Sequence, residues 1–327
     1  MRLVVWGLGH HAIDKILPAV SAADGLELYG VCSRNPMSVA NCSRAWKCRG
    51  WTEPESMLRD PQVEIVYVAT PIGLHVEHGK AALAAGRHLW CEKALTSRLV
   101  DTLALLEQSR GSGLSVCEAH MYLHHPQFLR LSKYLSDGRL GRILSVWCGF
   151  GIPPLANPGF RSDPRLGGGA LLDVGCYPIS AIQALFPNDA QIVKYSSVAS
   201  RDGALVDTDG YCVLELSNGA VATLEWKINS AYRNEIDIWG EEASLSTDKL
   251  FSKPAEYIPM FRFRNAQGGE TVEYAEAADH FVLMLEAFRR SIADARAMES
   301  ERRAIQRRAE VLDRIWSISS ARTVQGV

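Results

Sequence analysis

Residues 3–12 read LVVWGLGHHA, and this stretch decides how the first part of the chain folds. Its first four residues are apolar, as in a short buried strand, and two glycines then interrupt the apolar run. After the glycines, apolar side chains recur at helical spacing, at Ile13, Ile16, Leu17 and Val20. The order of strand, glycine turn and helix predicts the start of an α/β domain.

The glycine turn fits the pattern G-x-G-x-x-G/A. In that pattern the first glycine permits a tight turn, and the second lets the backbone approach a pyrophosphate. The small third residue lets the helix pack closely on the strand. Because the helix that follows presents free N–H groups to phosphates, the turn predicts a dinucleotide site. Its predicted cofactor contacts are Gly7, Gly9, His10, His11 and Ala12.

The first 120 residues alternate between short apolar runs and segments of helical spacing. Strands are predicted at residues 26–32, 63–70, 88–91 and 114–118, and helices at 75–85 and 99–109. Strands this apolar belong in a parallel sheet that helices cover on both faces. We therefore expect residues 1–120 to form a doubly wound Rossmann domain.

Residues 121–327 have a different pattern, with helices predicted at 126–135 and 171–185 among β-rich segments. These segments are residues 143–150, 190–199, 211–216, 220–228, 235–239 and 243–246. The pair Asn218–Gly219 predicts a hairpin in which both turn residues have positive φ. We expect an α+β domain for substrate binding and oligomerisation, with an open, mostly antiparallel sheet. The C-terminal helices are expected either in this domain or packed back on the first.

Composition narrows the class of protein. A length of 327 residues suggests two domains, and a net charge of −2 offers no basic surface for nucleic acid or an anionic membrane. The eight cysteines include no Cys-x-x-Cys pair, and no apolar run could span a bilayer. His75 and His78 have metal-ligand spacing but no evident carboxylate or cysteine partner. We expect a cytoplasmic protein without a metal, in which His75 begins a helix beside the cofactor and His78 is exposed.

The end of the second predicted strand indicates which dinucleotide binds. NAD binders usually place an acid there to accept a hydrogen bond from the ribose 2′-hydroxyl. This strand instead ends with Ser33-Arg34-Asn35 and has no acid. Arg34 can hold a 2′-phosphate or stack on the adenine, and Ser33 can donate to the phosphate. The chemistry favours NADP(H) over NAD(H).

Three further segments complete a recognisable set. Residues 69–75 read ATPIGLH, residues 91–95 read CEKAL, and residues 167–177 read GGGALLDVGCY. Together with the glycine turn, and in this order, they resemble the Gfo/Idh/MocA oxidoreductase family. That family includes glucose–fructose oxidoreductase, inositol dehydrogenases, xylose dehydrogenase and dimeric dihydrodiol dehydrogenase. The resemblance runs from the N-terminus to about residue 186, and the β-rich second half suits the family's C-terminal domain.

The resemblance implies roles for single residues. It places Lys93 near the nicotinamide and the substrate hydroxyl, and it pairs Asp173 with Tyr177 on a substrate-facing helix, where a spacing of four puts both on one face. Arg161 matches a basic residue that faces the substrate in relatives. The implied catalytic set is therefore Lys93, Asp173 and Tyr177, and either Lys93 or Tyr177 touches the reacting oxygen. Further implied cofactor contacts are Thr70, Pro71, His75 and Glu92, besides Lys93.

The chain departs from the family pattern at three positions. Ala94 stands where the family usually has proline, often after a cis bond that aims the lysine. A cis bond before a non-proline residue costs about 2.5–4 kcal/mol, so either this peptide is trans and Lys93 is aimed differently, or the site holds it cis. Leu123 stands where many relatives have arginine, and Ile72 replaces a common asparagine.

The resemblance implies hydride transfer between NADP(H) and a secondary alcohol or ketone carbon of a sugar, cyclitol or keto-sugar. Such a reaction moves a proton together with the hydride, which is the task of the implied acid–base set. Two alternatives remain open at this point. One is a dihydrodiol-type dehydrogenase with an aromatic substrate, and the other is a non-catalytic cofactor-binding sugar sensor. The family's open sheet also implies a homodimer or homotetramer.

Overall fold

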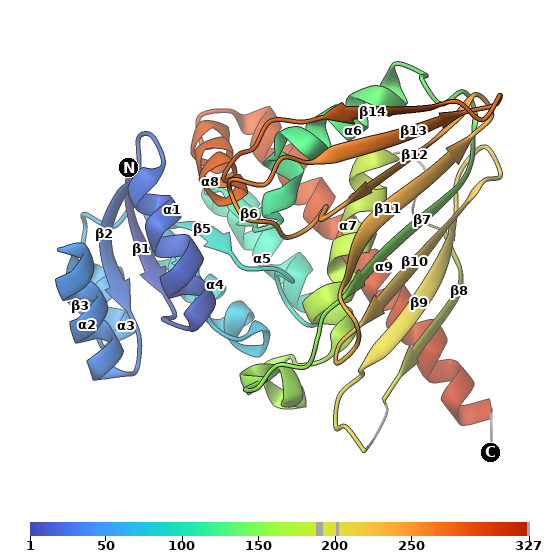
Figure 1. The fold of residues 1–327 in the computed structure, drawn as a ribbon. Helices are drawn as coiled ribbons and strands as arrows, with labels where there is room; N and C mark the ends of the chain where they lie inside the picture. The colour runs from blue at the N-terminus through green and yellow to red at the C-terminus, as the bar shows by residue number, and fades with distance from the viewer. Residues whose placement is uncertain (188–191, 201–202, 326–327) are drawn as a thin grey trace. The chain divides into compact units, whose positions relative to one another are not determined.

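The computed structural model describes residues 1–187, 192–200 and 203–325, which form two compact units. The first unit contains Met1–His120 and Phe281–Gln306. The second contains Met121–His280 and the chain from Arg307 onward. Each unit is built on one β-sheet, and Figure 1 shows the first sheet at the blue end of the chain and the second in green to orange.

The sheet of the first unit has six strands in the order β3-β2-β1-β4-β5-β6, and every neighbouring pair is parallel. This is the strand order of a dinucleotide-binding Rossmann domain, so the predicted fold class is confirmed. The strands are β1 (Arg2–Trp6), β2 (Glu27–Cys32), β3 (Arg49–Trp51), β4 (Ile65–Val68), β5 (His88–Cys91) and β6 (Val116–Glu118).

Helices surround this sheet and bury its apolar side chains. They are α1 (Leu17–Ala22), α2 (Pro36–Trp46), α3 (Pro54–Arg59), α4 (His75–Ala84), α5 (Leu99–Ser112), α8 (His280–Ser291) and the start of α9 (Ala295–Gln325). One buried cluster joins strand residues such as Val4 and Val66 to Leu105 of α5 and Ile305 of α9. The C-terminal helices therefore supply part of the core of a domain that begins at residue 1.

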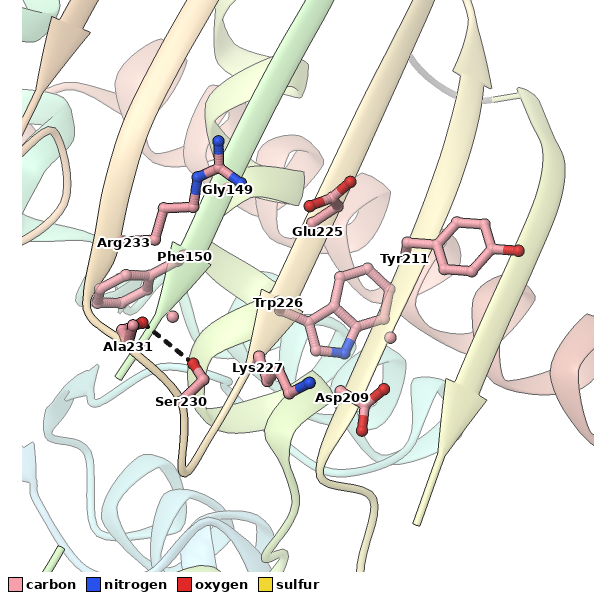
Figure 2. Close-up of a pocket in the computed structure, with 12 residues that line it drawn as sticks. Gly149, Phe150, Asp209, Tyr211, Glu225, Trp226, Lys227, Ser230, Ala231 and Arg233 are labelled. Carbon is pink, nitrogen blue, oxygen red and sulfur yellow. Dashed lines mark hydrogen bonds between the residues drawn. The ribbon is translucent and has the colours of Figure 1, made fainter. Parts of the chain in front are cut away.

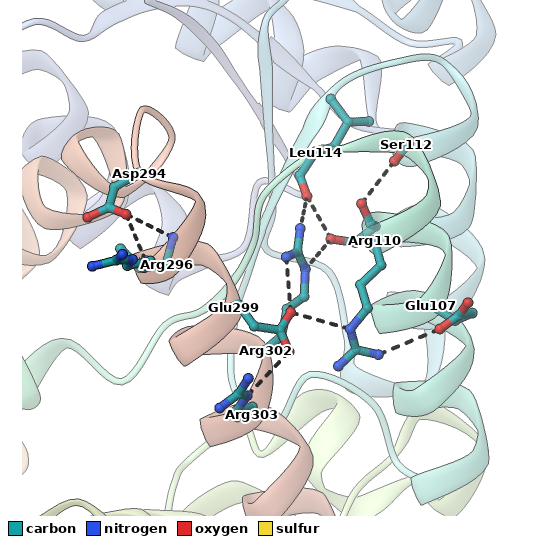
Figure 3. Close-up of polar contacts among 11 residues, drawn as sticks. Glu107, Arg110, Ser112, Leu114, Asp294, Arg296, Glu299, Arg302 and Arg303 are labelled. Atoms are coloured by element: carbon teal, nitrogen blue, oxygen red, sulfur yellow. Dashed lines mark hydrogen bonds and ion pairs between the residues drawn. The ribbon is translucent and has the colours of Figure 1, made fainter.

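Arg302 fixes the start of α9 to the end of α5. Its side chain is buried; Nε donates to Ser109 Oγ at 3.0 Å and Nη2 donates to the Leu114 carbonyl at 2.9 Å. Glu299 Oε2 lies 3.4 Å from Nη1 and balances the charge. Figure 3 shows the guanidinium between Glu299 and the turn that ends at Leu114. A buried arginine with acceptors on both sides holds the two helices in register.

The sheet of the second unit has eight strands in the order β14-β13-β12-β11-β7-β10-β9-β8. Within the described residues of this sheet, only the pair β7 and β10 is parallel, which confirms the predicted mostly antiparallel sheet. The strands are β7 (Ile143–Gly151), β8 (Ile192–Ala199), β9 (Asp209–Glu215), β10 (Val221–Lys227), β11 (Arg233–Gly240), β12 (Ala243–Asp248), β13 (Met260–Asn265) and β14 (Glu270–Tyr274). Residues 190 and 191, predicted as the start of β8, lie outside the described residues.

One face of this second sheet is covered by helices and the other is open. Along β10 and β11, buried and more exposed residues alternate, as expected when a sheet is covered on one side only. Helix α7 (Cys176–Leu185) packs against β7 and β10, and Figure 1 shows it lying across them. The unit also contains α6 (Pro126–Ser136), which begins after His125 as predicted.

The turn between β9 and β10 differs from the predicted type. Gly219 has φ +83°, but Asn218 is not among the residues with positive φ. The Gly219 N–H donates to the Leu216 carbonyl, and the Leu216 N–H donates to the Ala220 carbonyl. This pattern is a three-residue loop in which glycine follows an ordinary turn, so the prediction of positive φ at both residues was wrong. The hairpin itself is confirmed.

Candidate functional site

The glycine turn after β1 has the geometry that its sequence predicts. Gly7 has φ +113°, and a Cβ at this position would lie 2.6 Å from the Ala69 carbonyl carbon. Its N–H donates to the Cys32 carbonyl at 2.9 Å, which holds the turn against β2. A Cβ at Gly9 would meet no atom within 4 Å, so the backbone there borders open space. The turn therefore leaves an approachable backbone at the second glycine, as a pyrophosphate requires.

The helix after this turn starts with one turn of π-helix, η1 (Ala12–Ile16). Ala12 is buried, whereas His10 and His11 are exposed. The side chain of the N-cap residue, His11, does not accept from the first N–H groups of this helix. Uncapped N–H groups at a helix start are a common site for phosphate. The predicted contacts from Gly7 to Ala12 thus lie on one continuous turn.

Glu92 connects the glycine turn with the segment that carries Lys93. Its Oε1 accepts from Tyr67 Oη at 2.7 Å and lies 3.1 Å from His11 Nε2. Burial raises the pKa of Glu92, but His11, Tyr67 and the charge of Lys93 outweigh burial and lower it to about 2. Glu92 is therefore a carboxylate at neutral pH. Glu92 contacts the glycine turn at His11, and Lys93 is the next residue in the sequence.

The end of β2 carries the residues predicted to choose the cofactor. Ser33 Oγ accepts from the Asn35 N–H, and the Asn35 side chain caps α2 through the N–H groups of Met37 and Ser38. Arg34 is exposed and has no ion-pair partner among the residues that the structure describes. An arginine without a carboxylate partner is available to a phosphate group.

Thr70 and Pro71 follow β4, and two histidines of α4 hold this loop. His78 Nδ1 lies 2.9 Å from Thr70 Oγ1, and its ring stacks on Trp6 with the ring centres 3.9 Å apart. Burial lowers the pKa of His78 to about 4. The expectation that His78 is exposed was wrong, because the stacked ring is half-buried. His75 is fully buried, and both of its ring nitrogens face backbone carbonyls.

The peptide bond between Lys93 and Ala94 is cis, which settles the alternative that the sequence left open. Lys93 is half-buried and Ala94 is buried. The next residue, Leu95, donates its N–H to Oε1 of the buried Glu118 at 2.7 Å. The segment after Lys93 is therefore fixed on its N–H side by a buried carboxylate.

In the second unit, Asp173 lies on one turn of π-helix, η6 (Leu171–Gly175), directly before α7. Asp173 is buried, and its Oδ2 accepts from Arg161 Nε at 2.7 Å. The structure thus brings together two of the predicted substrate residues. Like the cofactor helix, this helix begins with a π-turn, a feature that is frequent at functional sites.

The glycine run before Asp173 is explained by two close approaches. Gly169 has φ +119°, and a Cβ there would collide with Asp207 Oδ1. A Cβ at Gly168 would lie 2.5 Å from the Arg161 carbonyl oxygen. Asp207 Oδ2 accepts from the Leu171 N–H at 2.6 Å, and burial raises the pKa of Asp207 to about 6. Asp207 was not predicted, since it acts from 36 residues further along the chain.

Tyr177 lies in the first turn of α7, within a cluster of aromatic rings. The ring centres of Phe150, Phe251 and Tyr122 lie 5.1, 5.5 and 6.0 Å from that of Tyr177. Its hydroxyl contacts Met121 Sδ at 3.9 Å, and the residue is 8% exposed. The rings fix the plane of Tyr177. Asp173 and Tyr177 belong to the second unit, and Lys93 belongs to the first.

A depression of about 290 Å³ lies on the second sheet, and it contains none of the predicted site residues. Figure 2 shows the side chains of Tyr211, Glu225, Lys227 and Arg233 around it, on β9, β10 and β11.

Among the described residues, no cluster of side chains could hold a metal ion, and no helix is long and apolar enough to cross a membrane.

Comparisons with known proteins test the resemblance. Residues 1–120 match the model for an oxidoreductase family with an NAD-binding Rossmann fold, and residues 128–246 match the Gfo/Idh/MocA C-terminal domain. The dTDP-3,4-didehydro-2,6-dideoxy-alpha-D-glucose 3-reductase of Saccharopolyspora spinosa is 31% identical, over 80% of this chain and 79% of its own. The chain belongs to the Gfo/Idh/MocA oxidoreductase family. The family resemblance predicted from the motifs is thus confirmed.

Other members of this family align over nearly the whole chain. The NADP(+)-dependent D-xylose 1-dehydrogenase 2 of Haloferax volcanii is 27% identical, over 100% of this chain and 96% of its own. A 3-ketoreductase from Actinomadura kijaniata, solved in complex with NADP and TDP-benzene, superposes with a TM-score of 0.92. It is 28% identical, and the match covers 97% of each chain.

Proposed function

We propose that this Gfo/Idh/MocA protein is an NADP(H)-dependent oxidoreductase. It transfers a hydride between the nicotinamide and a secondary alcohol or ketone carbon of a sugar, cyclitol or keto-sugar. The observation that carries the proposal is the position of Glu92, which contacts His11 of the glycine turn and directly precedes Lys93. This contact joins the glycine turn, which suits a pyrophosphate, to the segment that contains Lys93, which suits proton transfer.

The residues around the glycine turn fit NADP. The open space at Gly9 and the uncapped N–H groups of η1 suit the pyrophosphate. Arg34 and Ser33 follow β2 without an acid that would repel a 2′-phosphate. The named relatives agree, since the Haloferax dehydrogenase carries NADP(+) in its name and the Actinomadura ketoreductase was solved with NADP.

When bound, the dinucleotide donates or accepts the hydride. The chain's own residues handle the proton. In the direction of reduction, a proton passes from the Tyr177 hydroxyl or the Lys93 ammonium to the substrate oxygen as a C–H bond forms at the carbonyl carbon. In the direction of oxidation, the same group takes that proton back. Asp173 orients the substrate hydroxyl groups, with Arg161 beside it.

A keto-sugar fits the second unit best. Asp173 and Arg161 offer an acceptor and a donor side by side, which suits the neighbouring hydroxyl groups of a sugar ring. Several relatives are named as reductases of a dTDP-linked keto-sugar, including the Saccharopolyspora protein. We therefore assign the first unit, residues 1–120 together with residues 281–306, to cofactor binding, and the second unit to substrate binding and assembly.

The open face of the second sheet supports assembly into a homodimer or homotetramer. Trp239, Val221 and Tyr211 lie on this face, and they are 60%, 41% and 37% exposed. On the edge strand β14, Tyr274 and Val272 are also exposed. Apolar side chains gathered on an uncovered sheet face mark a surface that is buried by association. Light scattering of the purified protein would measure the mass, and a Trp239→Glu variant is expected to shift it toward the monomer.

The decisive experiment measures NADPH consumption and NADP reduction with a panel of aldoses, inositols, dihydrodiols and a dTDP-linked keto-sugar. Lys93→Met is assayed in parallel, with Lys80→Met, an exposed lysine of α4, as its control. We expect turnover of a sugar or keto-sugar that Lys93→Met lowers by at least about a hundredfold. Activity confined to dihydrodiols would contradict the sugar assignment. Tight NADPH binding without any turnover would favour a sensor.

A further inference from the structure

His75 is the first residue of α4, and its ring lies between two loops of the first unit. Nδ1 lies 3.0 Å from the Ala94 carbonyl oxygen and 3.2 Å from that of Leu95. Nε2 lies 2.7 Å from the Thr70 carbonyl oxygen. Three backbone carbonyls from two loops thus converge on one buried ring.

Carbonyl oxygens only accept hydrogen bonds, so the ring must donate to them. A neutral imidazole carries one N–H, whereas an imidazolium carries two. Burial lowers the pKa of His75, against the opposing effects of the carbonyls and Glu92, so the neutral ring prevails at neutral pH. The one N–H of the neutral His75 ring can then donate to only one of the two loops at a time. It is directed either to Thr70 or to the segment after Lys93.

The two residues after Lys93 are held through their backbone atoms. The N–H of Leu95 is held by Glu118, while the carbonyls of Ala94 and Leu95 face Nδ1 of His75. Ala94 and Leu95 are both buried, so no solvent replaces a lost contact there. The direction of Lys93 therefore depends on both ends of this turn.

His75 itself is fully buried and has no surface to offer to a dinucleotide or a sugar. The family resemblance suggested it as a cofactor contact. The geometry instead puts it behind the site, in contact with the loops that carry Thr70 and Lys93.

We infer that His75 is a positioning residue, whose Nδ1–H holds the carbonyls of Ala94 and Leu95 and so aims Lys93. The inference rests on the proposed function, because aiming Lys93 matters for turnover only if Lys93 handles the proton. His75 acts through the backbone of its neighbours and touches no reacting atom. In the other tautomer, the hydrogen is on Nε2, which donates to the Thr70 carbonyl and holds the loop that carries Thr70.

Two amide substitutions separate the two sides of the ring. The side-chain nitrogen of asparagine reaches the place of Nδ1, and that of glutamine reaches the place of Nε2. His75→Asn should therefore keep the donor toward Ala94 and Leu95, and kcat should stay within about twofold of wild type. His75→Gln keeps only the donor toward Thr70. Its kcat should fall by about ten- to a hundredfold and its kcat–pH profile should shift, while the Kd for NADPH changes less than about threefold.

His88→Asn is the matched control, because His88 is half-buried on β5 and contacts Ser115 instead of either loop. Circular dichroism and thermal melting establish that each variant is folded. Equal losses of kcat in His75→Asn and His75→Gln would mean that the ring acts only as packing, which would overturn the inference. A larger loss in His75→Asn than in His75→Gln would overturn it as well.

Two measurements do not depend on turnover, and the first of them uses the wild-type protein alone. Nitrogen-15 spectra of wild-type protein labelled at histidine should show a hydrogen on Nδ1 of His75 in a measurable fraction of molecules. A hydrogen confined to Nε2 would overturn the inference. The rate at which acetic anhydride modifies Lys93, read by peptide mass spectrometry, should change in His75→Gln and remain as in wild type in His75→Asn. These results stand even if no substrate in the panel is turned over, so they separate this inference from the proposed function.

Discussion

Oδ2 of Asp173 accepts a hydrogen bond from Nε of Arg161 at 2.7 Å, and the two residues are twelve positions apart in the chain. Asp173 is only 5% exposed, so its carboxylate depends on nearby donors and cations more than on water. The pair lies in the second unit, where the substrate is proposed to bind. Weakening the pair between Arg161 and Asp173 should therefore lower both the affinity for the substrate and the turnover rate.

Arg161→Met should lower kcat/KM by about ten- to a hundredfold, since a hydrogen bond between charged groups contributes about 1.5–3 kcal/mol. Arg165→Met is the control: Arg165 forms the same kind of pair with Asp163, but its side chain is 87% exposed. The control should change kcat/KM less than about twofold. In a double-mutant cycle with Asp173→Asn, the two losses should be less than additive. Full additivity would show that the two side chains act independently.

Glu92 should make the stability of the fold depend on pH in a defined window. Its pKa is lowered from 4.5 to about 2 in the folded protein, so its contribution is present above pH 4.5 and is lost as the pH falls toward 2. Glu92→Gln should lower the free energy of unfolding at pH 5 by about 2–3 kcal/mol. Below pH 4.5 the difference from wild type should shrink. Urea unfolding at several pH values measures this, with the exposed Glu77→Gln as control.

Arg34 should set the preference for NADP(H). Arg34→Ala removes the cation that we propose binds the 2′-phosphate, so the Kd for NADPH should rise by about tenfold or more while the Kd for NADH stays nearly unchanged. Fluorescence titration with both cofactors measures this preference. Arg44→Ala removes an exposed arginine of α2 and should change neither constant. Equal weakening of NADPH and NADH in Arg34→Ala would show that the arginine stacks on the adenine instead.

Arg302 and Arg303 are neighbours with opposite burial, which allows a matched test of stability. The side chain of Arg302 is 7% exposed and that of Arg303 is 70% exposed, and both contact Glu299. Arg302→Met should destabilise the fold by about 1–3 kcal/mol, because the buried Ser109 hydroxyl and the Leu114 carbonyl lose their donor, while Glu299 keeps Arg110 and Arg303. Arg303→Met should cost less than about 1 kcal/mol. Chemical denaturation of both variants measures the difference. Equal effects would refute the anchoring role of Arg302.

Local patterns were enough to predict the frame of the first unit. The strand that ends at Trp6, the turn at Gly7 and Gly9, and the buried Ala12 are fixed by residues close in sequence, and the structure confirms them. Strand β3 was not predicted, because it has only three residues and begins with an exposed arginine. Its place at the sheet edge comes from pairing with β2, which no local pattern encodes.

The details of the candidate site depended on contacts between distant segments. Asp207 holds the start of the Asp173 helix from a loop that has no recognisable motif. The motif identified His75, but only the folded chain shows that its ring faces carbonyls of two loops. The turn at Asn218 was predicted with the wrong type, because the hydrogen bonds of Leu216 and Ala220 allow an extra residue there.

The composition of the first unit sets an order of events during protein synthesis. Its core includes Ile305, while its first strand begins at Arg2. As the chain leaves the ribosome, Met1–His120 therefore emerges long before Phe281–Gln306, which completes the same unit. Part of the apolar surface of the first unit therefore stays uncovered until the second sheet and the residues after it have been translated. A ribosome that stalls near residue 280 would hold a chain whose dinucleotide motif is complete but whose domain is not.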